Sequence, residues 1–363
     1  MKNFRALSIL TVALLMLASL PLPISYSQQI DYAQRERQAP PAIRATLATL
    51  RNEIQTKRFT FQVGYTLAAD RNLEQLAGLK PPTNLAAIAN KQNALAVQLL
   101  RIDNASREEY ARLNPNVKLP ELSLQCNPSA AAFDWRKLGK VTPVRDQGGC
   151  GSCWAFATIG AYEGSYLIRN GGSPDASEQD VLSCSGLGTC AGGWWAFDFL
   201  LGKGDASEAS YPYTATDSPC NASIPDPYWA TTWGYVKPGG ATPSVGEMKQ
   251  ALCQYGPLAV AVRVTTAFRH YTAGVFNENA SGSVNHGVTL IGWDDTKGAW
   301  LIKNSWGTGW GDTCGYGSQR GYMWITYGSN SIGYAAAWVR AKSRYYKLPD
   351  TYYRLVPKII PTP

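Results

Sequence analysis

The sequence predicts an α+β protein of two lobes, preceded by a separate and mainly helical unit. In the second part of the chain helical patterns come first and strand patterns follow, which favours segregated helices and strands over an alternating parallel sheet. Residues 28–128 contain one cysteine and no tryptophan, whereas both become frequent from Phe133 onward. With 363 residues, 45% of them apolar, the chain is long enough for two such units.

The chain begins with a pattern typical of a cleaved signal peptide, which we expect over residues 1–27. Lys2 and Arg5 precede the apolar run 6–20, and prolines and small residues follow it. A membrane anchor is the weaker alternative, because about 18 apolar residues are needed to span a bilayer. We therefore expect an exported protein, either secreted, periplasmic or in a lysosome- or vacuole-like compartment, with no membrane span after signal removal.

The leading unit, residues 28–128, contains two stretches with helical periodicity. These stretches are 42–56 and 85–104, and the sequence Lys80-Pro81-Pro82 separates them. The segment 115–128 has the composition of an exposed joint, which is a typical site of proteolytic nicking.

The second unit, residues 129–342, opens with a helix and continues into strands. Residues 153–170 lack proline and end at Gly171-Gly172, which predicts a helix with its C-terminal stop. Ser244 and Glu247 form a capping box before a second helix. Short apolar stretches bounded by glycines then predict strands within 258–264, 287–295, 298–306 and 321–328.

A basic tail, residues 343–363, ends the chain. The formal net charge of +8 is spread along the sequence and concentrates only between residues 340 and 358. We interpret these charges as a solvated surface and expect no nucleic-acid partner, with polyanion binding as the weaker alternative.

The motif Cys150-Gly151-Ser152-Cys153 allows three interpretations. A redox pair is expected within a thioredoxin-like βαβ pattern, which is not evident here. A zinc site needs two further ligands, but the chain has two histidines and no second CxxC motif. The third interpretation gives the two sulfurs different fates, a disulfide for Cys150 and a nucleophile for Cys153. Since an exported chain forms disulfides by default, we prefer the third.

The position of Cys153 at the start of a predicted helix favours its thiolate, because the helix dipole and free N–H groups lie there. A thiolate nucleophile needs a base, and the base needs a group that orients it. His286 directly precedes one predicted strand and Asn304 ends the next, so neighbouring strands could bring both to one sheet edge. His270 lies outside any such motif, and we interpret it as a surface or packing residue.

These motifs resemble the papain-like cysteine peptidases. CGSCW with a histidine and an asparagine 133 and 151 residues downstream is typical of that family. The resemblance covers about residues 132–340 and also runs through SEQDVLSC, CAGG, YPY, GPLAVAV, NHGV and KNSWGTGWGD in the family's order. It implies a papain-like fold with a helical lobe, a β-barrel-like lobe and an active-site cleft between them. It also implies that no metal or organic cofactor is needed.

The resemblance assigns the catalytic roles. Cys153 attacks the scissile carbonyl, and His286 is its ion-pair partner and then the general acid that protonates the leaving amine. Asn304 holds the imidazole, and Trp306 shields that hydrogen bond from water. The Gln147 side-chain amide and the Cys153 backbone N–H form the oxyanion hole.

The resemblance also implies a substrate-binding surface. Gly192 and Gly193 let a substrate backbone approach and pair as an added strand, with a plain turn as the alternative. The residues expected to bind substrate are Gly192, Gly193, Trp194, Trp195, Ala261, Val284, Asn285, Trp306 and Ala337. Trp194 and Trp195 replace a tyrosine and a proline familiar in papain, so we expect a bulkier wall. The pocket for the second residue before the cut, P2, carries no acid, so we expect an apolar or aromatic side chain there.

The resemblance pairs Cys150 with Cys190 and Cys184 with Cys220. If the mature enzyme begins after Cys126 and Cys153 stays free, Cys253 and Cys314 remain. We expect these two to bridge and to pin the inserted stretch TCGYGSQR, although the sequence permits other pairings.

The leading unit is expected to be a propeptide that inhibits the enzyme, with a folding aid or an unrelated domain as alternatives. The sequence RFTFQVGYTLAADRNLEQLAGLKPP, residues 58–82, looks like a variant of the family's propeptide core. The resulting prediction is the zymogen of a monomeric cysteine endopeptidase that acts on peptides and proteins and is inhibited by its own propeptide. An aminopeptidase, an acyltransferase with the same chemistry and a catalytically silent binding protein are the rivals.

Overall fold

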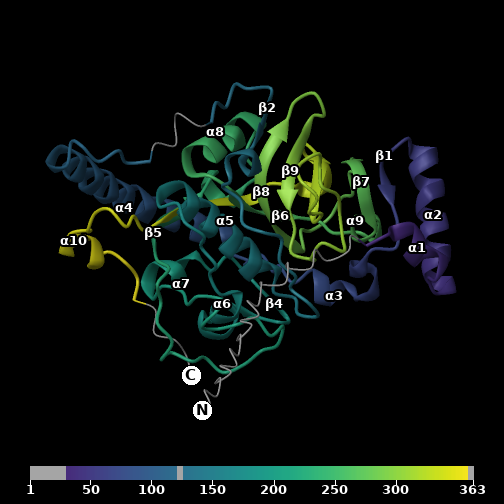
Figure 1. The fold of residues 1–363 in the computed structure, drawn as a ribbon, viewed down its shortest axis with the longest axis horizontal. Helices are drawn as coiled ribbons and strands as arrows, with labels where there is room; N and C mark the ends of the chain where they lie inside the picture. The colour runs from purple at the N-terminus through teal and green to yellow at the C-terminus, as the bar shows by residue number, and fades with distance from the viewer. Residues whose placement is uncertain (1–29, 121–125, 359–363) are drawn as a thin grey trace, which may run out of the picture.

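A leading unit and two lobes make up the computed structural model, which describes residues 30–120 and 126–358. The expected signal peptide lies outside the described residues. Helices of the second unit lie beside a large sheet, and the leading unit reaches both ends of the molecule, with α1, α2 and β1 at one end and α4 at the other (Figure 1). This is the α+β arrangement that the sequence predicts. In the described part of the chain, none of the helices has the length and apolar character needed to cross a membrane.

The leading unit contains four helices and one strand within its described residues. They are α1 (Tyr32–Arg37), α2 (Pro41–Lys57), β1 (Thr60–Val63), α3 (Leu73–Leu76) and α4 (Leu85–Leu113), with a 3-10 turn η1 at Leu67–Asp70. The predicted helices at 42–56 and 85–104 are confirmed, but α4 continues nine residues further than expected. Its last turns are polar, and the ion pair between Glu109 and Arg112 supports them.

The second unit follows the predicted order of helices and then strands. Its helices are α5 (Cys153–Arg169), α6 (Glu178–Cys184), α7 (Phe197–Gly202), α8 (Val245–Tyr255) and α9 (Thr266–Arg269), and a further helix, α10 (Asp350–Tyr353), lies in the tail. Its strands are β2 (Ala132–Asp134), β3 (Gly188–Thr189), β4 (Gly192–Gly193), β5 (Ala230–Tyr235), β6 (Leu258–Val262), β7 (Tyr271–Phe276), β8 (His286–Asp294), β9 (Ala299–Lys303), β10 (Tyr322–Thr326) and β11 (Tyr334–Ala341). Three 3-10 turns, η2 (Trp135–Leu138), η3 (Pro238–Gly240) and η4 (Ser329–Ser331), complete the elements. The capping box predicted for α8 is present, since Ser244 and Glu247 bond to each other's backbone N–H groups.

The main sheet joins the two units. Its strand order is β1-β7-β10-β9-β8-β6-β11-β5, with β2 paired to β8. Only the β7–β10 pair is parallel among the described strands. Because β1 comes from the leading unit, that unit extends the catalytic sheet by one strand.

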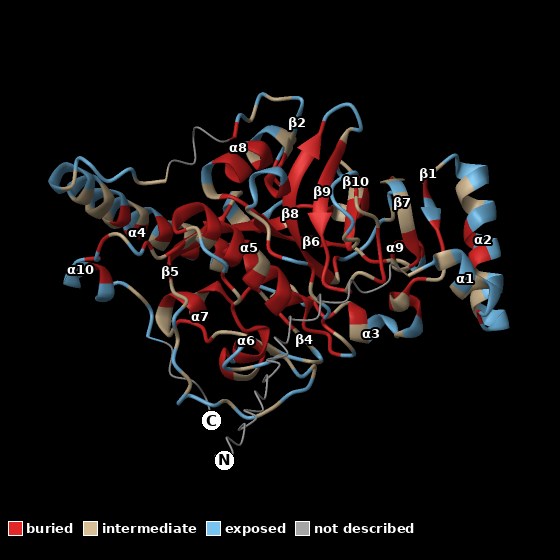
Figure 2. Ribbon diagram, in the orientation of Figure 1, coloured by how far each residue is buried: buried red, intermediate tan, exposed pale blue. Residues whose placement is uncertain are grey.

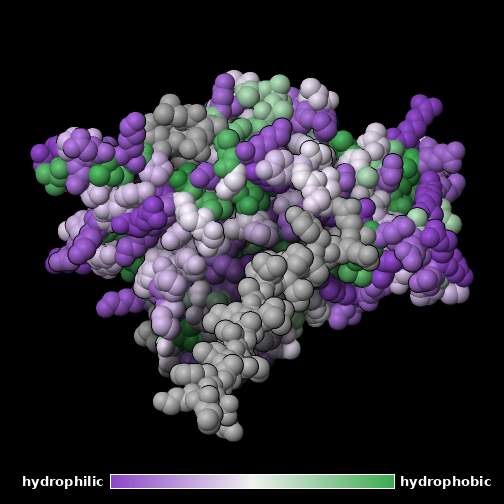
Figure 3. All heavy atoms as spheres, viewed as in Figure 1, coloured by the Kyte–Doolittle hydropathy of each residue, from purple (hydrophilic) through white to green (hydrophobic). Residues whose placement is uncertain are grey.

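Helix α5 is the central helix of the molecule. It packs against β8, β11 and β6, and nearly all of its residues are buried (Figure 2). By contrast, the outer face of α2 is exposed, and hydrophilic side chains cover that end of the surface (Figure 3). The apolar faces of β6, β8 and β11 thus pack on α5 and fix the position of its first residue, Cys153.

The disulfide prediction for Cys253 and Cys314 is wrong. Cys253 bonds to Cys126, while Cys314 is a free, buried thiol. The reason is packing, because Cys126 and Cys253 belong to one apolar cluster, whereas Cys314 lies in another with Val144 and Ile291. The expectation had assigned Cys126 to the leading unit and so removed it from the count.

Peptide mapping without reduction should recover the peptide pair that contains Cys126 and Cys253. Cys314 should resist alkylation in the native protein, because burial raises the pKa of its thiol, and should react once the chain is unfolded. Native labelling of Cys314 at the rate of a free thiol would contradict this assignment. The pairs Cys150–Cys190 and Cys184–Cys220 are internal controls, since neither should react without reductant.

Candidate active site

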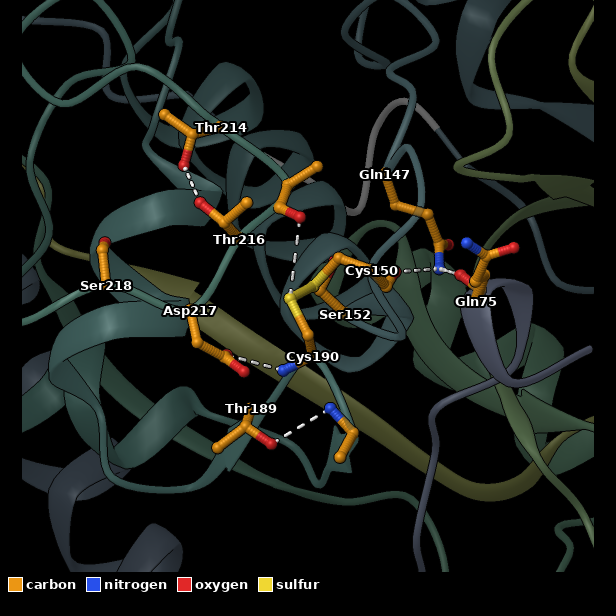
Figure 4. The surroundings of a disulfide bond; sticks show 12 residues. Gln75, Gln147, Cys150, Ser152, Thr189, Cys190, Thr214, Thr216, Asp217 and Ser218 are labelled. Atoms are coloured by element: carbon orange, nitrogen blue, oxygen red, sulfur yellow. Dashed lines mark hydrogen bonds between the residues drawn. A yellow bond between two sulfur atoms is a disulfide. The ribbon is translucent and has the colours of Figure 1, made fainter. Parts of the chain in front are cut away.

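The thiol of Cys153 lies at the first residue of α5, where the sequence places it. The side chain is completely buried and its sulfur is not in a disulfide. The adjacent Cys150 bonds to Cys190 (Figure 4), which is one of the two pairs that the resemblance implies. The two cysteines of the CxxC motif therefore have different fates, as the third interpretation expects.

His286 and Asn304 meet at one edge of the sheet. His286 is the first residue of β8, and Asn304 directly follows β9, the antiparallel neighbour of β8. The His286 Nε2 lies 2.8 Å from the Asn304 Oδ1. Gly287, the next residue of β8, packs on the start of α5, because a Cβ placed on Gly287 would lie 3.2 Å from the Cys153 carbonyl oxygen.

This geometry selects one form of the imidazole. The Asn304 Oδ1 also accepts a hydrogen bond from the Ser305 N–H at 2.8 Å, so it acts as an acceptor and Nε2 donates to it. A neutral ring with its proton on Nε2 has its lone pair on Nδ1, and no described group bonds to that nitrogen with acceptable geometry. Trp306 covers the ring, with its centroid 4.8 Å from that of His286.

Gln147 lies beside the CxxC motif, and hydrogen bonds to both the oxygen and the nitrogen of its side-chain amide fix the orientation of that group. Its Oε1 accepts a hydrogen bond from the Ser305 hydroxyl at 2.7 Å, which leaves the Nε2 group to donate. That nitrogen donates to the Cys150 carbonyl at 2.9 Å and to the Gln75 carbonyl at 3.1 Å (Figure 4). The amide predicted for the oxyanion hole therefore bonds to a backbone carbonyl of the leading unit.

Residues 75–80 of the leading unit occupy this site through their backbone. The Leu76 carbonyl accepts from the Trp306 Nε1 at 3.2 Å. Gly78 and Lys80 pair with Gly193, since the Gly193 N–H donates to the Gly78 carbonyl and the Lys80 N–H to the Gly193 carbonyl, both at 2.9 Å. The expected strand-pairing role of Gly193 is thus used here by the leading unit.

Several residues predicted to line the P2 pocket belong to the same large buried apolar cluster as Leu79 of the leading unit. Leu79 is 3% exposed, and its N–H donates to the Asn285 carbonyl at 2.9 Å. The cluster that contains Leu79 also contains four of the residues expected to line the pocket, namely Trp195, Ala261, Val284 and Ala337. Trp194 packs on the cluster from its edge.

Trp194 and Gly192, two of the residues predicted to bind substrate, are both held in a defined conformation. The Trp194 Nε1 donates to the Tyr235 hydroxyl at 2.9 Å, which holds the half-buried indole in place. Gly192 has φ +121, a backbone conformation that side chains rarely adopt, and a Cβ there would lie 2.5 Å from the Gly78 carbonyl oxygen.

Burial sets the protonation states of the covered site. It raises the pKa of Cys153 to about 11, although N–H groups of Gly287, Gly78, Trp154 and Leu79 oppose the shift. Burial also lowers the pKa of His286 to about 4, against the opposing effects of Asn304 and the Leu76 carbonyl. Between these values the site holds a neutral thiol and a neutral imidazole. The helix start favours a thiolate at Cys153, but in the covered site desolvation outweighs the helix terminus, so the predicted thiolate is absent there.

The sequence analysis did not identify which residues of the leading unit reach the site. Their contacts are made by backbone N–H and C=O groups, which leave little signature in side chains. Gly78 is the residue whose type reflects this close approach, because a Cβ at that position would lie 1.7 Å from the Gly151 carbonyl oxygen. Ser305, which orients Gln147, was also missed, although it lies inside the quoted KNSWGTGWGD motif.

Comparison with known proteins agrees with this geometry. The model of the papain family of cysteine proteases matches residues 129–340. The chain belongs to the papain family. Among curated relatives, fruit bromelain of Ananas comosus is 32% identical over 242 residues, covering 62% of this chain and 67% of the relative. Cysteine proteinase 1 of Entamoeba histolytica is 31% identical, covering 77% of this chain and 85% of the relative.

Solved structures of the papain family match both units. Procathepsin L2 from the larval midgut of Tenebrio molitor matches with a TM-score of 0.62 and 25% identity, covering 86% of this chain and 94% of that one. Bromelain from Ananas comosus, solved in complex with the inhibitor E64, has 34% identity and a TM-score of 0.51 and covers 58% of this chain and 99% of that one. The chain is therefore a papain-like cysteine protease of the precursor type.

The close approach at Gly78 gives a test of how the leading unit binds. We expect Gly78→Ala to raise the rate of thiol labelling at Cys153 in the uncut full-length chain by about tenfold or more, because its Cβ would collide with Gly151. Gly246→Ala is the matched control, since nothing lies near the added Cβ in α8. Equal labelling rates in the Gly78→Ala variant and the parent chain would contradict the docked position of residues 75–80.

Proposed function

We propose that this protein is the exported zymogen of a cysteine endopeptidase that cleaves peptide bonds through Cys153, His286, Asn304 and Gln147. The observation that carries the proposal is the 2.8 Å hydrogen bond between His286 and Asn304 beside a free thiol at a helix start. Asn304 holds the imidazole with Nδ1 available as the base, and the neutral pair becomes a thiolate and imidazolium once water and substrate replace the leading unit.

Each step of the reaction uses a group already described. The Cys153 sulfur attacks the scissile carbonyl carbon, and the negative charge that develops on its oxygen is stabilised by the Gln147 Nε2 and the Cys153 N–H. His286 then gives its proton to the leaving amine, which breaks the peptide bond and leaves an acyl-enzyme. A water molecule, deprotonated by His286, releases the acid and restores the thiol.

The preferred P2 residue is apolar, and leucine is the best-supported example. Leu79 lies in the cluster with Trp195, Ala261, Val284 and Ala337, and none of these side chains carries charge. The leading unit pairs in parallel with Gly193 at this position. A substrate that pairs with the same glycine would place its own side chain in the same cluster.

The leading unit is the propeptide, and it inhibits by occupying the cleft with residues 75–80. The bridge between Cys126 and Cys253 constrains where maturation cuts the chain. A cut after Pro128 would leave the propeptide attached through this disulfide, at a high effective concentration beside the cleft. We therefore place the maturation cut before Cys126 instead of after residue 128. Three disulfides among the described residues support export to an oxidising compartment.

The first test is active-site labelling with an epoxide inhibitor of the E64 type. Reduced, matured protein should bind one equivalent, and Cys153→Ala should bind none. Gln147→Ala should lower kcat by about 10²- to 10³-fold, because it removes one oxyanion donor, while thiol labelling by a simple alkylating agent persists. An enzyme that hydrolyses peptides normally with Cys153→Ala, or a matured protein that never labels, would exclude the proposed function.

Acidification should favour propeptide release, because both histidines of the chain are covered by the leading unit. Burial lowers the pKa of His286 to about 4. Burial also lowers the pKa of His270, whose Nδ1 lies 3.0 Å from the Gly64 carbonyl. This predicted packing residue is thus buried and not on the surface. The released form binds protons at higher pH than the docked form, so release should rise as pH falls below about 6.5. His286 should contribute up to about tenfold per pH unit down to about pH 4, and His270 should add to this slope.

The measurement uses the Cys153→Ala chain, cut once before Cys126 by another protease, and follows dissociation of the propeptide between pH 4 and 7. His270→Gln is the comparison variant, since it removes one titrating group outside the catalytic residues and should make the pH dependence less steep. Release that is equal at pH 4 and pH 7 would contradict this prediction.

A further inference from the structure

Arg169 and Arg340 of the catalytic unit converge on a single carboxylate, Asp103 of α4. Asp103 has no exposed surface, and the side chains of Arg169 and Arg340 are 9% and 14% exposed. The Arg340 Nη1 lies 2.8 Å from the Asp103 Oδ2, and the Arg169 Nη2 lies 3.2 Å from the same oxygen. Asp103 is therefore a buried acid that both arginines share.

A third donor comes from the C-terminal tail. The hydroxyl of Tyr346 donates to the Asp103 Oδ1 at 2.9 Å and accepts from the Arg169 Nη2 at 2.6 Å. Tyr110 lies seven residues after Asp103 and thus on the same face of α4, and its ring centroid is 6.3 Å from that of Tyr346. The tail thus contacts α4 through both a polar and an aromatic group.

The tail itself is fixed to the catalytic unit and not to α4 alone. The Asn170 side chain bonds to the Lys342 carbonyl and the Arg344 N–H, both at 2.9 Å. The Tyr352 hydroxyl donates to the Thr231 carbonyl at 2.8 Å, and Leu348 is buried. In Figure 1 the tail and α10 lie beside α4, at the end of the molecule away from α2. The tail that carries Tyr346 is therefore held on the catalytic unit by contacts that do not involve α4.

We propose that the C-terminal tail completes a second binding site for the propeptide, in which Arg169, Arg340 and Tyr346 bind the carboxylate of Asp103. This inference rests on the proposed propeptide role of the leading unit. Asp103 lies 18 residues after the start of α4, which is about 27 Å along a helix, while residues 75–80 occupy the cleft before that start. The two sites thus hold opposite ends of one segment.

Electrostatics explains why this site selects an acid. Two buried guanidinium groups close to one another destabilise the folded chain unless an anion lies between them. The burial of Arg340 and the neighbouring charge of Arg169 lower the pKa of Arg340, which agrees with such crowding. A neutral amide at position 103 would keep the shape of the side chain but leave both positive charges without a partner.

The experiment measures hydrogen exchange across residues 95–113 in the full-length Cys153→Ala chain, which cannot process itself. We expect Asp103→Asn to accelerate exchange at least tenfold and Tyr346→Phe to accelerate it about fivefold, since each removes part of one shared interaction. Exchange in the double variant Asp103→Asn/Tyr346→Phe should be only slightly faster than in Asp103→Asn, because the Tyr346 hydroxyl has already lost the charge of its acceptor. Glu108→Gln and Tyr345→Phe are the matched controls from the same helix and the same tail, and neither should change exchange.

Two results would overturn this proposal. One is unchanged exchange in Asp103→Asn, and the other is a double variant whose acceleration equals the product of the single effects. If Asp103→Asn does not fold, Tyr346→Phe against Tyr345→Phe carries the test. The matured Tyr346→Phe enzyme should keep kcat/KM within about twofold, and a larger loss would show a role in the catalytic unit itself and also overturn the proposal.

Failure of the proposed function would look different. A wild-type chain that is fully active with its leading unit still bound would exclude the propeptide role. The exchange measurement would still report whether Asp103 and Tyr346 are coupled, because it does not depend on activity.

Discussion

Close packing of α5 on the sheet is the constraint on which the site depends. Gly160 and Gly164 let the backbone of α5 approach the strands, because an added Cβ would lie 2.4 Å from Thr289 or from Pro257. This approach puts the start of the helix against the first residues of β8. A slip of one residue in β8 would turn His286 to the other face of the sheet. Cys153 and His286 are therefore positioned by main-chain packing, and the hydrogen bond to Asn304 then orients the imidazole.

The covered site is held in an electrically neutral state by the same burial. The thiol and the imidazole both lose water to residues 75–80, and each then prefers its uncharged form. Under the proposed function, inhibition by the leading unit has two parts, which are blocked access to Cys153 and the absence of its thiolate. Uncovering the site restores both at once, since water that enters the cleft also stabilises the charges.

Much of this site could be predicted from the sequence, because α5, β8 and β9 carry strong local signals. The glycine pair after Asn170, the run after His286 and the KNSWG stretch each indicate one element and its end. The pairing of Cys253 could not be predicted, because it depends on where Cys126 lies in space. The sequence does not predict the last nine residues of α4, since they are mostly polar and one of them, Tyr110, packs on Tyr346 of the tail. The sequence does not indicate that residues 75–80 occupy the site, because backbone groups make their contacts.

The pairing of β1 with β7 has a consequence for solubility. In the full-length chain β7 lies between β1 and β10, and a Cβ on its Gly274 would lie 2.4 Å from the Thr60 carbonyl oxygen, so the two strands fit closely. In the maturation proposed above, departure of the leading unit makes β7 an edge strand with unpaired N–H and C=O groups, which can add strands from other chains. Until that moment β1 caps the sheet and protects the newly folded protein from edge-to-edge association.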